Sequence, residues 1–319
     1  MKEKIVFLDS STVDFGDIDF SAIEALGDLK CHKITSPGEV AERCKEVTIA
    51  ITNKVVFDAD ILSKCPNLKM IEVAATGYNI IDIAEAKKRN ITVANVPGYS
   101  TPTVAQLTMA FILALSTNLI KYDQATHDGT WSRSDIFTLG NWPFFDLEGK
   151  TIGIMGLGTI GKKVAGLCRA FGMNVIALKR GESASDCPYR RVELYDLAAE
   201  SDFISIHMPL TDYSKNIVNT EFLSHMKKTA FLINMARGPV VEPSALCHAL
   251  EKGIIAGAAL DVMEKEPPSA DDPLLKAPNL IITPHIAWAS IESRRRLLNE
   301  IAENIKGFLG GVKRNVVSG

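Results

Sequence analysis

Short apolar runs alternate with amphipathic stretches along most of this chain, which is the pattern of parallel strands joined by helices. In the first hundred residues we predict strands at 4–8, 29–33, 48–51, 69–74 and 91–94, and helices at 21–26, 37–44, 58–64 and 82–89. This alternation predicts an open parallel sheet with helices on both faces.

A second pattern of the same kind begins at Lys150. We predict strands at 150–155, 174–180, 203–207, 230–235, 255–260 and 280–283, and helices at 162–173, 194–200, 221–226 and 243–252. An apolar helix at 103–118, with Thr101 as its N-cap, precedes this pattern, and a long helix at 286–309 follows it. We therefore expect two α/β domains, one of residues 1–100 plus 287–319 and one of residues 101–286.

The turn after the strand at 150–155 reads G-L-G-T-I-G, from Gly156 to Gly161. A dinucleotide-binding turn requires this order of elements: a strand, the G-x-G-x-x-G turn, a helix and a second strand. Gly156 permits the tight turn, Gly158 lets the backbone approach a pyrophosphate, and Gly161 lets the helix pack closely on the strand. The alternative is a glycine turn that binds no nucleotide.

The second strand of this domain ends in Lys179 and Arg180, where an NAD-specific site usually carries Asp or Glu for the ribose 2′-hydroxyl. Two cations suit a 2′-phosphate better than a bare hydroxyl. We therefore expect a preference for NADPH over NADH. In the alternative, these cations form a solvated strand end and the protein uses NADH.

Three polar residues come shortly after predicted strands of the second domain: Arg237, Glu266 and His285. Open α/β sheets place ligands at the carboxyl ends of their strands, so we expect these side chains to meet beside a nicotinamide. Hydride reduction of a ketone leaves an alkoxide that needs a proton, which a histidine beside a carboxylate can supply. Arg can polarise the carbonyl and hold a carboxylate. Taken singly, each residue is also typical of a solvated loop.

Two further segments are informative. The loop at 74–79, A-A-T-G-Y-N, follows a strand, and its backbone N–H groups suit a carboxylate, although an ordinary turn fits equally well. Residues 121–147 look irregular and are rich in aromatic residues. This indicates a surface covered by a second subunit, unless the rings pack on their own domain.

Composition limits the classes of function. The chain has 319 residues, of which 46% are hydrophobic and 23% charged, as in ordinary soluble globular proteins. The net charge of −3 gives no reason to expect nucleic acid, and we see no membrane-spanning run or signal peptide. The six cysteines form no C-x-x-C pair, so we expect reduced thiols in the cytoplasm, and we assign no metal site.

Several motifs together are more specific. They are A-T-G-Y-N at 75–79, N-V-P-G-Y-S-T-P-T-V-A at 95–105, G-L-G-T-I-G at 156–161, H-M-P-L-T at 207–211, N-M-A-R-G-P at 234–239, L-D-V-M-E-K-E-P-P at 260–268 and T-P-H-I-A-W-A-S at 283–290. In order and spacing, the chain resembles the D-isomer-specific 2-hydroxyacid dehydrogenases along nearly its whole length, and most of all their glycerate dehydrogenase (hydroxypyruvate reductase) branch. The resemblance implies a Rossmann NAD(P)-binding domain, a flavodoxin-like substrate domain and a homodimer built around residues 121–147.

The same resemblance implies roles for single residues. Arg237 would bind the substrate carboxylate and carbonyl, with His285 as the acid/base and Glu266 as its partner. The remaining substrate contacts would be the backbone of Ala75, Thr76 and Gly77, and the ring of Trp288. The residues implied at the cofactor are Thr76, Val104, Gly156, Gly158, Thr159, Ile160, Gly161, Lys179, Arg180, Met208, Met235, Ala236, Asp261 and His285, with Asp261 reaching the nicotinamide amide.

The sequence departs from the family pattern at three positions. Lys179 replaces the usual acidic residue, Trp288 replaces a small residue near His285, and Pro239 replaces the commoner second glycine after Arg237. We predict an enzyme that reduces a small 2-keto acid of the hydroxypyruvate or glyoxylate type with NAD(P)H. The alternatives are a phosphoglycerate dehydrogenase, for which the first domain lacks an obvious cluster of cations, and a non-enzymatic corepressor-like protein that senses the nucleotide.

Overall fold

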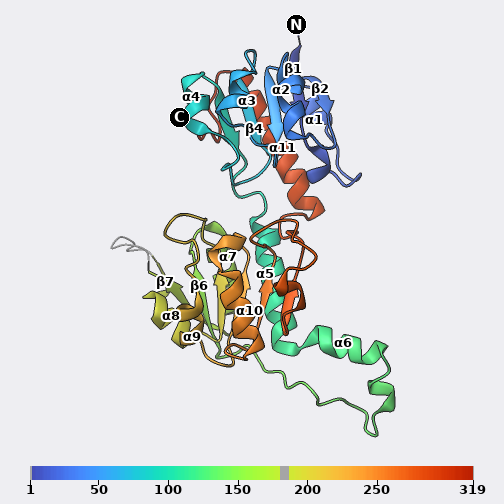
Figure 1. The fold of residues 1–319 in the computed structure, drawn as a ribbon, viewed down its shortest axis with the longest axis vertical. Coiled ribbons are helices and arrows are strands. Elements are labelled where there is room, and N and C mark those ends of the chain that lie inside the picture. The colour runs from blue at the N-terminus through green and yellow to red at the C-terminus, as the bar shows by residue number, and fades with distance from the viewer. Residues whose placement is uncertain (1, 180–186, 319) are drawn as a thin grey trace. The chain divides into compact units, whose positions relative to one another are not determined.

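The computed structural model describes residues 2–179 and 187–318. The chain divides into two compact units: Met1–Ser100 with Trp288–Gly319 form unit 1, and Thr101–Ala287 forms unit 2. Each unit contains one parallel sheet with helices packed on it (Figure 1). The predicted α/β fold class with two open sheets is therefore confirmed.

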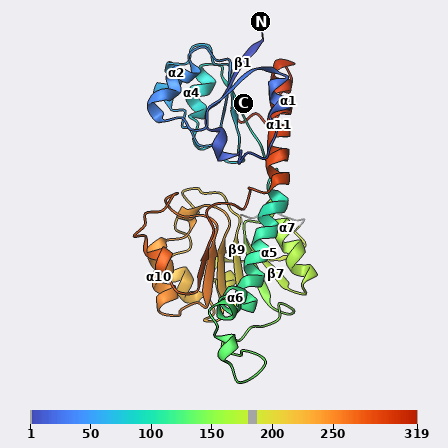
Figure 2. The same cartoon turned by 90° about the vertical axis from the view of Figure 1, so that its right-hand side faces the viewer.

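The sheet of unit 1 has the strand order β2-β1-β3-β4-β5, which is the flavodoxin-like order. Its strands are β1 (Glu3–Phe7), β2 (Gly27–Cys31), β3 (Ile49–Thr52), β4 (Met70–Val73) and β5 (Thr92–Asn95), and its helices are α1 (Ser21–Glu24), α2 (Val40–Cys44), α3 (Ala59–Ser63), α4 (Ile83–Lys88) and α11 (Ile291–Leu309). Helices α1 and α11 cover one face, and α2, α3 and α4 cover the other (Figure 2).

The alternation of side chains in β1 explains its continuous apolar run. Ile5 and Phe7 belong to the hydrophobic cluster that contains α11 residues, whereas Val6 and Leu8 belong to the cluster that contains residues of α2 to α4. Since helices cover both faces of the sheet, both sets of side chains are buried and apolar.

The sheet of unit 2 has the strand order β12-β11-β10-β9-β6-β7-β8, and its neighbouring strands are parallel. Its strands are β6 (Thr151–Met155), β7 (Asn174–Leu178), β8 (Arg190–Val192), β9 (Phe203–Ile206), β10 (Phe231–Asn234), β11 (Gly257–Leu260) and β12 (Leu280–Ile282), and its helices are α5 (Thr101–Thr117), α6 (Leu119–His127), α7 (Thr159–Ala170), α8 (Leu194–Glu200), α9 (Thr220–His225) and α10 (Pro243–Glu251). Helices α5 and α7 pack on one face, and α8, α9 and α10 on the other. The strand order reverses between β6 and β9, and dinucleotides bind at such a switch point.

Several elements differ from the sequence-based prediction. The last helix begins at Ile291 rather than at 286, because the hydroxyl of Ser290 caps it by accepting the Ser293 N–H over 3.1 Å. Thr101 is the first residue of α5 instead of its N-cap. The pattern also misses β8, a short strand that contains two arginines.

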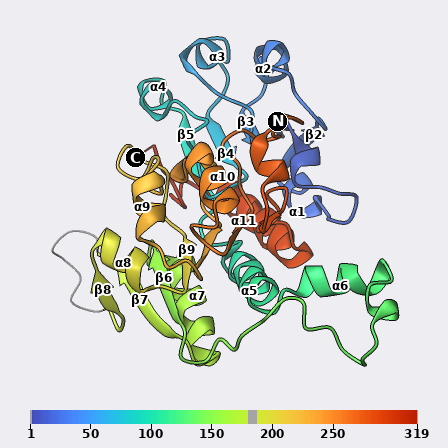
Figure 3. The ribbon, with the colours of Figure 1, turned by 60° about the horizontal axis from the view of Figure 1, so that its bottom comes forward.

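Residues 121–147, expected to be irregular, begin within a helix. Helix α6 runs to His127, and Ala125 is its one buried residue, so hydrophobic periodicity does not reveal it. Helix α6 and the segment after it extend away from α5 (Figure 3). Among the described helices, none is long and apolar enough to cross a membrane alone; α5 and α6 reach that length and composition only as a pair bent by 64°.

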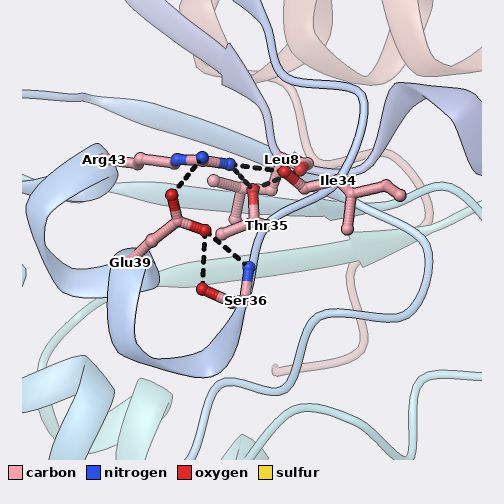
Figure 4. A network of polar contacts seen from close by, with 6 residues as sticks. All are labelled: Leu8, Ile34, Thr35, Ser36, Glu39 and Arg43. Atoms are coloured by element: carbon pink, nitrogen blue, oxygen red, sulfur yellow. Dashed lines mark hydrogen bonds and ion pairs between the residues drawn. The ribbon is translucent and has the colours of Figure 1, made fainter.

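A polar network holds the loop after β2 against the end of β1 in unit 1 (Figure 4). The Thr35 hydroxyl donates to the Leu8 carbonyl oxygen. The Arg43 guanidinium of α2 donates to the Thr35 hydroxyl over 2.5 Å and to the Glu39 carboxylate over 2.6 Å. Glu39 also accepts the Ser36 N–H over 2.9 Å, which completes a capping box before α2. This loop is therefore fixed by its own side chains.

Candidate active site

The glycine-rich turn joins β6 to α7 where the strand order reverses. Gly156 has φ +99°, and a Cβ there would lie 2.7 Å from backbone atoms of His207 and Met208, which follow β9. A Cβ on Gly161 would collide with the Gly156 carbonyl oxygen, whereas a Cβ on Gly158 would meet no described atom within 4 Å beyond its own chain neighbours and helix backbone. The turn therefore needs the first and third glycines for its own packing, and the second faces open space.

Helix α7 starts directly at this turn, with Gly158 as its N-cap. Thr159 and Ile160 occupy its first two positions, and the Lys162 N–H donates to the Gly158 carbonyl over 2.9 Å. The N–H groups before Lys162 precede the helical bonding pattern and can donate to phosphate oxygens. The residues of this turn therefore fit the pyrophosphate of a dinucleotide.

Three other residues expected at the cofactor in unit 2 follow neighbouring strands. Met208 follows β9, and the buried Met235 and Ala236 follow β10. Strands β9 and β10 pair in the sheet, and the Met235 N–H donates to the Ile206 carbonyl over 3.3 Å. Val104 is buried in the first turn of α5. Thr76, also expected at the cofactor, belongs to unit 1.

The end of β7 carries a cation that already has a partner. The Lys179 ammonium lies 2.9 Å from the Glu193 carboxylate, and the side chains are 50% and 68% exposed. The Lys179 N–H donates to the Val192 carbonyl over 2.9 Å, which fixes the strand end beside β8. Arg180, the second expected cation, lies outside the described residues. Glu193 is an additional residue of this strand end that the sequence pattern did not predict.

His285 and Glu266 are in direct contact. The imidazole Nδ1 lies 2.6 Å from one Glu266 oxygen, and the other oxygen accepts the Met263 N–H over 3.0 Å. A carboxylate beside Nδ1 favours the tautomer with hydrogen on that nitrogen, which leaves Nε2 for a ligand. The His285 and Glu266 side chains are 26% and 34% exposed, so the pair is accessible from solvent.

Asp261 shapes the loop that carries His285. Its buried carboxylate accepts the Thr283 hydroxyl over 2.6 Å and the N–H groups of Ile286 and Ala287 over 2.9 Å each. The His285 N–H donates to the Asp261 carbonyl over 2.9 Å, and His285 adopts φ +54°. Burial raises the pKa of Asp261, although these hydrogen bonds oppose the shift. The structure thus shows contacts of Asp261 that the sequence analysis did not anticipate.

Arg237 lies in a loop that a buried asparagine holds at both ends. Asn234, the last residue of β10, donates from its amide to the Arg237 carbonyl over 2.9 Å and accepts the Ala236 N–H over 3.0 Å. The Arg237 side chain is exposed, and one guanidinium nitrogen donates to the Ala236 carbonyl over 2.7 Å. Asn234 was missed in the sequence, although its place at the end of an apolar strand is visible there.

The loops after β10 and β11 pack closely on each other. A Cβ on Gly238 would collide with the backbone of Met263 and Glu264, so the residue after Arg237 must be glycine for this approach. Pro239 then occupies the first turn of a 3₁₀ helix, η4 (Gly238–Val240), which its fixed φ suits. The Arg237 loop thus rests against the segment that leads to Glu266.

The substrate residues expected in the first domain lie in unit 1. Ala75, Thr76 and Gly77 follow β4 in a loop whose Thr76 is exposed. The Thr76 hydroxyl donates to the Val96 carbonyl over 3.0 Å. Trp288 also belongs to unit 1, where its ring packs against the hydrophobic cluster that contains α11 residues. Its effect on a substrate pocket stays a prediction.

His207 follows β9, and its backbone packs against Gly156. Its ring Nε2 lies 2.9 Å from the Ser205 hydroxyl, and burial lowers the pKa of His207 to about 3. The ring is therefore neutral at physiological pH.

Comparison with known proteins identifies the class to which this site belongs. The model of the D-isomer specific 2-hydroxyacid dehydrogenase NAD binding domain matches residues 109–287. The chain belongs to this family and is an NAD(P)-dependent oxidoreductase that acts on the CH–OH group of 2-hydroxy acids. The expected family, enzyme class and nicotinamide cofactor are thereby confirmed.

Individual relatives narrow the comparison. A hydroxypyruvate reductase of Blautia hydrogenotrophica is 38% identical over 322 residues, which cover 99% of each chain. The structure of D-lactate dehydrogenase from Aquifex aeolicus with NAD and lactic acid has a TM-score of 0.87 and 30% identity, over 99% of both chains. That of the NADPH-dependent glyoxylate/hydroxypyruvate reductase from Sinorhizobium meliloti has a TM-score of 0.85 and 26% identity, over 99% of this chain and 97% of the other.

Proposed function

We propose that this protein reduces a small 2-keto acid, with hydroxypyruvate and glyoxylate as the first candidates, to the 2-hydroxy acid, of D configuration where the product is chiral. The hydroxypyruvate reductase that matches the full length of the chain supports this substrate class. A reduced nicotinamide, when bound, supplies the hydride. The protein must orient the keto acid and deliver a proton to its carbonyl oxygen.

The contact of 2.6 Å between His285 and Glu266 carries this proposal. Glu266 fixes the ring with Nδ1 toward the carboxylate, so that Nε2 exchanges a proton with the substrate. As hydride reaches the carbonyl carbon, negative charge develops on the oxygen, and His285 donates its proton there. The Glu266 carboxylate compensates the charge of the doubly protonated ring.

Arg237 and the loop 75–77 hold the substrate in this proposal. The planar guanidinium can bind a carboxylate with two parallel hydrogen bonds and can stabilise the developing oxyanion. The side chain of Arg237 is exposed and therefore available for such contacts. Asn234 fixes the backbone that carries it. The backbone N–H groups of the loop in unit 1 supply further donors for the carboxylate.

A panel of 2-keto acids, assayed with NADH and with NADPH through the absorbance of the reduced nicotinamide, tests the reaction. We expect the highest kcat/KM with hydroxypyruvate or glyoxylate, and D-glycerate as the product from hydroxypyruvate. A protein that reduces none of these acids, or that produces L-glycerate, would contradict the proposal.

We further propose that NADPH is preferred, because Lys179 follows β7, where an NAD-specific site carries an acidic residue for the ribose 2′-hydroxyl, and Arg180 is the next residue in the sequence. The exposed ion pair of Lys179 with Glu193 is weak, so a 2′-phosphate can replace the Glu193 carboxylate. Glu193→Gln should then lower KM for NADPH about two- to fivefold, and Lys179→Gln should raise it about tenfold.

The matched control is Lys64→Gln, which removes an equally exposed ion pair with Asp60 in unit 1 and should change neither cofactor constant. A wild-type kcat/KM that favours NADH would overturn the cofactor preference without affecting the proposed reaction.

We also propose a homodimer built around residues 121–147. In this segment the side chains of Trp131, Phe137 and Phe144 are 47%, 90% and 62% exposed, which is costly for a free surface. Phe145 instead packs on its own unit, with its ring 6.0 Å from that of Phe231. We therefore assign only the exposed rings of the segment to the subunit interface, and Phe145 to its own domain. A groove of about 1010 Å³, partly lined by Phe144, lies beside it and can receive a partner.

Light scattering after size-exclusion chromatography tests this assembly. We expect the mass of a dimer for the wild type and that of a monomer for Phe137→Asp. Tyr213→Asp introduces the same charge at a similarly exposed position of unit 2 and should stay dimeric.

The unpaired state of all six cysteines also leads us to propose the cytoplasm as the compartment.

A further inference from the structure

We propose that Asn95 is a positioning residue that sets the direction of the backbone N–H groups in the loop 75–77, and that Asn304 and Glu72 hold Asn95 in place. The inference rests on the proposed role of this loop in binding the substrate carboxylate. It concerns residues of unit 1 to which the proposed chemistry assigns no role, although Asn95 begins the motif at 95–105.

Three hydrogen bonds tie the loop to the end of β5. The Val96 N–H donates to the Ala75 carbonyl over 3.0 Å. The Asn95 side-chain amide donates to the Thr76 carbonyl over 2.6 Å, and the Thr76 hydroxyl donates to the Val96 carbonyl over 3.0 Å. Two successive carbonyl groups of the loop therefore point toward Asn95 and Val96.

The direction of these carbonyls decides where the N–H groups point. In a planar trans peptide group the N–H is directed opposite to the carbonyl. The Ala75 carbonyl shares its peptide group with the Thr76 N–H, and the Thr76 carbonyl shares its group with the Gly77 N–H. Both N–H groups are thus turned away from β5 and lie on one side of the loop. Two successive N–H groups on one side form a concave donor pair that suits a carboxylate.

Asn95 is itself fixed by buried polar groups. Its carbonyl accepts from the Asn304 amide over 3.1 Å, and its N–H donates to the Asn315 carbonyl over 3.2 Å. The Asn304 amide, on α11, also donates to Glu72 over 2.8 Å, and its oxygen accepts from the Asn315 amide over 2.9 Å. Asn304 thus connects the last helix, β4 and β5 behind the loop, with its side-chain hydrogen-bonding capacity well used.

Glu72 fits this position as a neutral acid. Its side chain is fully buried, and its second oxygen has no hydrogen-bond partner among the described residues. Burial raises the pKa of Glu72 well above its usual range, and the charge of Glu300 adds to the shift, whereas the bond from Asn304 opposes it. A neutral carboxyl group can accept from Asn304 without placing a negative charge behind a loop that must attract a carboxylate.

Asn95→Asp tests the inference, because the side chain keeps its size and replaces the donor by a carboxylate that repels the Thr76 carbonyl. We expect KM for the best keto acid to rise about 10- to 100-fold, the range for a hydrogen bond to a charged group, while KM for the cofactor stays within about twofold. Lower pH should bring the KM of Asn95→Asp closer to that of the wild type, since the introduced carboxyl group can donate a hydrogen bond once it is protonated. Asn95→Ala should change KM in the same direction and serves if the first variant does not fold.

Asn67→Asp is the matched control, because the Asn67 amide also donates to a carbonyl of unit 1, that of Lys45 over 2.9 Å, but at an exposed position. We expect wild-type constants for it. Hydrogen exchange without substrate separates this inference from the proposed reaction: residues 74–79 should exchange about tenfold faster in Asn95→Asp, with β4 unchanged. Unchanged exchange of this loop would overturn the positioning role, whether or not the wild type reduces a keto acid.

Discussion

The carboxyl edges of the two sheets carry different kinds of polar group, and our proposals use them differently. In unit 2 the loops after β10, β11 and β12 carry the charged side chains of Arg237, Glu266 and His285. In unit 1 the loop after β4 offers backbone N–H groups, and the side chains that direct them lie behind it in the core. Side-chain chemistry can be removed by one substitution at the site, whereas backbone chemistry is changed only through the residues that support it.

This difference predicts where substitutions act most strongly. The largest effect should come from His285→Ala, because no other group of the proposed site can donate the proton in its place. We expect kcat to fall about 10²- to 10⁴-fold, the usual size for a general acid. Steady-state kinetics with the best keto acid measure it. Turnover near that of the wild type would remove His285 from the proposed chemistry and weaken the contrast between the two edges.

Arg237→Lys should have the next largest effect. Lysine keeps the charge but cannot form two parallel hydrogen bonds to a carboxylate, so we expect kcat/KM to fall about 10- to 100-fold. The far-ultraviolet circular dichroism and Tm should stay unchanged, because the side chain is exposed. If kcat and KM are both unaltered, Arg237 is a solvated loop residue and not a substrate clamp.

The glycine turn tests whether unit 2 also contains a backbone site. Gly161→Ala meets the Gly156 carbonyl and should lower the free energy of unfolding by about 1–3 kcal/mol, as expected for overpacking. Gly158→Ala has space for its methyl group and should leave Tm close to wild type while raising KM for the cofactor several-fold. Thermal unfolding and cofactor titration distinguish the two. Equal losses of stability would show that the second glycine is structural.

The smallest expected effect on the reaction concerns Glu72 in unit 1, because pH changes there alter stability rather than turnover. Its pKa is raised in the folded state, so the stability contributed by the neutral carboxyl is complete below about pH 4.5 and is lost as pH rises toward the folded pKa. Relative to Glu72→Gln, the wild type should lose unfolding free energy as pH rises through that window, because its folded state binds a proton that the unfolded state releases. Urea unfolding between pH 4.5 and 8 measures the difference. Parallel curves for the two proteins would mean that Glu72 ionises normally.

The strands and the glycine turn could be predicted because their signals are local. Continuous apolar runs mark strands that are covered on both faces, and the three glycines of the turn stand at fixed spacing. Helix α6 was missed because almost none of its face is buried, and the start of the last helix was placed too early because the Ser290 cap was not recognised. Local signals fail where burial is absent or where one side chain ends a pattern.

The residues of the candidate site also differ in whether a local sequence signal marks them. Arg237, Glu266 and His285 could be named from the sequence because each comes shortly after a predicted strand of the same domain and the motifs around them are specific. The supporting contacts of Asn234, Asn95 and Asn304 could not be predicted. Asn234 and Asn95 begin two of the quoted motifs, but a motif does not show which carbonyl or amide group each side chain meets in the fold.

By itself, the order of residues determined two α/β layers, a dinucleotide turn and a family, because periodicity and motif spacing are properties of neighbouring positions. Tertiary structure alone decided that Glu266 touches His285, that Glu193 lies beside Lys179, and that buried amides direct the loop of unit 1. The first three of these contacts join positions 14 to 19 residues apart, and the amide of Asn304 meets Asn95 across 209 residues. Such hydrogen bonds form only when the folded backbone brings donor and acceptor within about 3 Å.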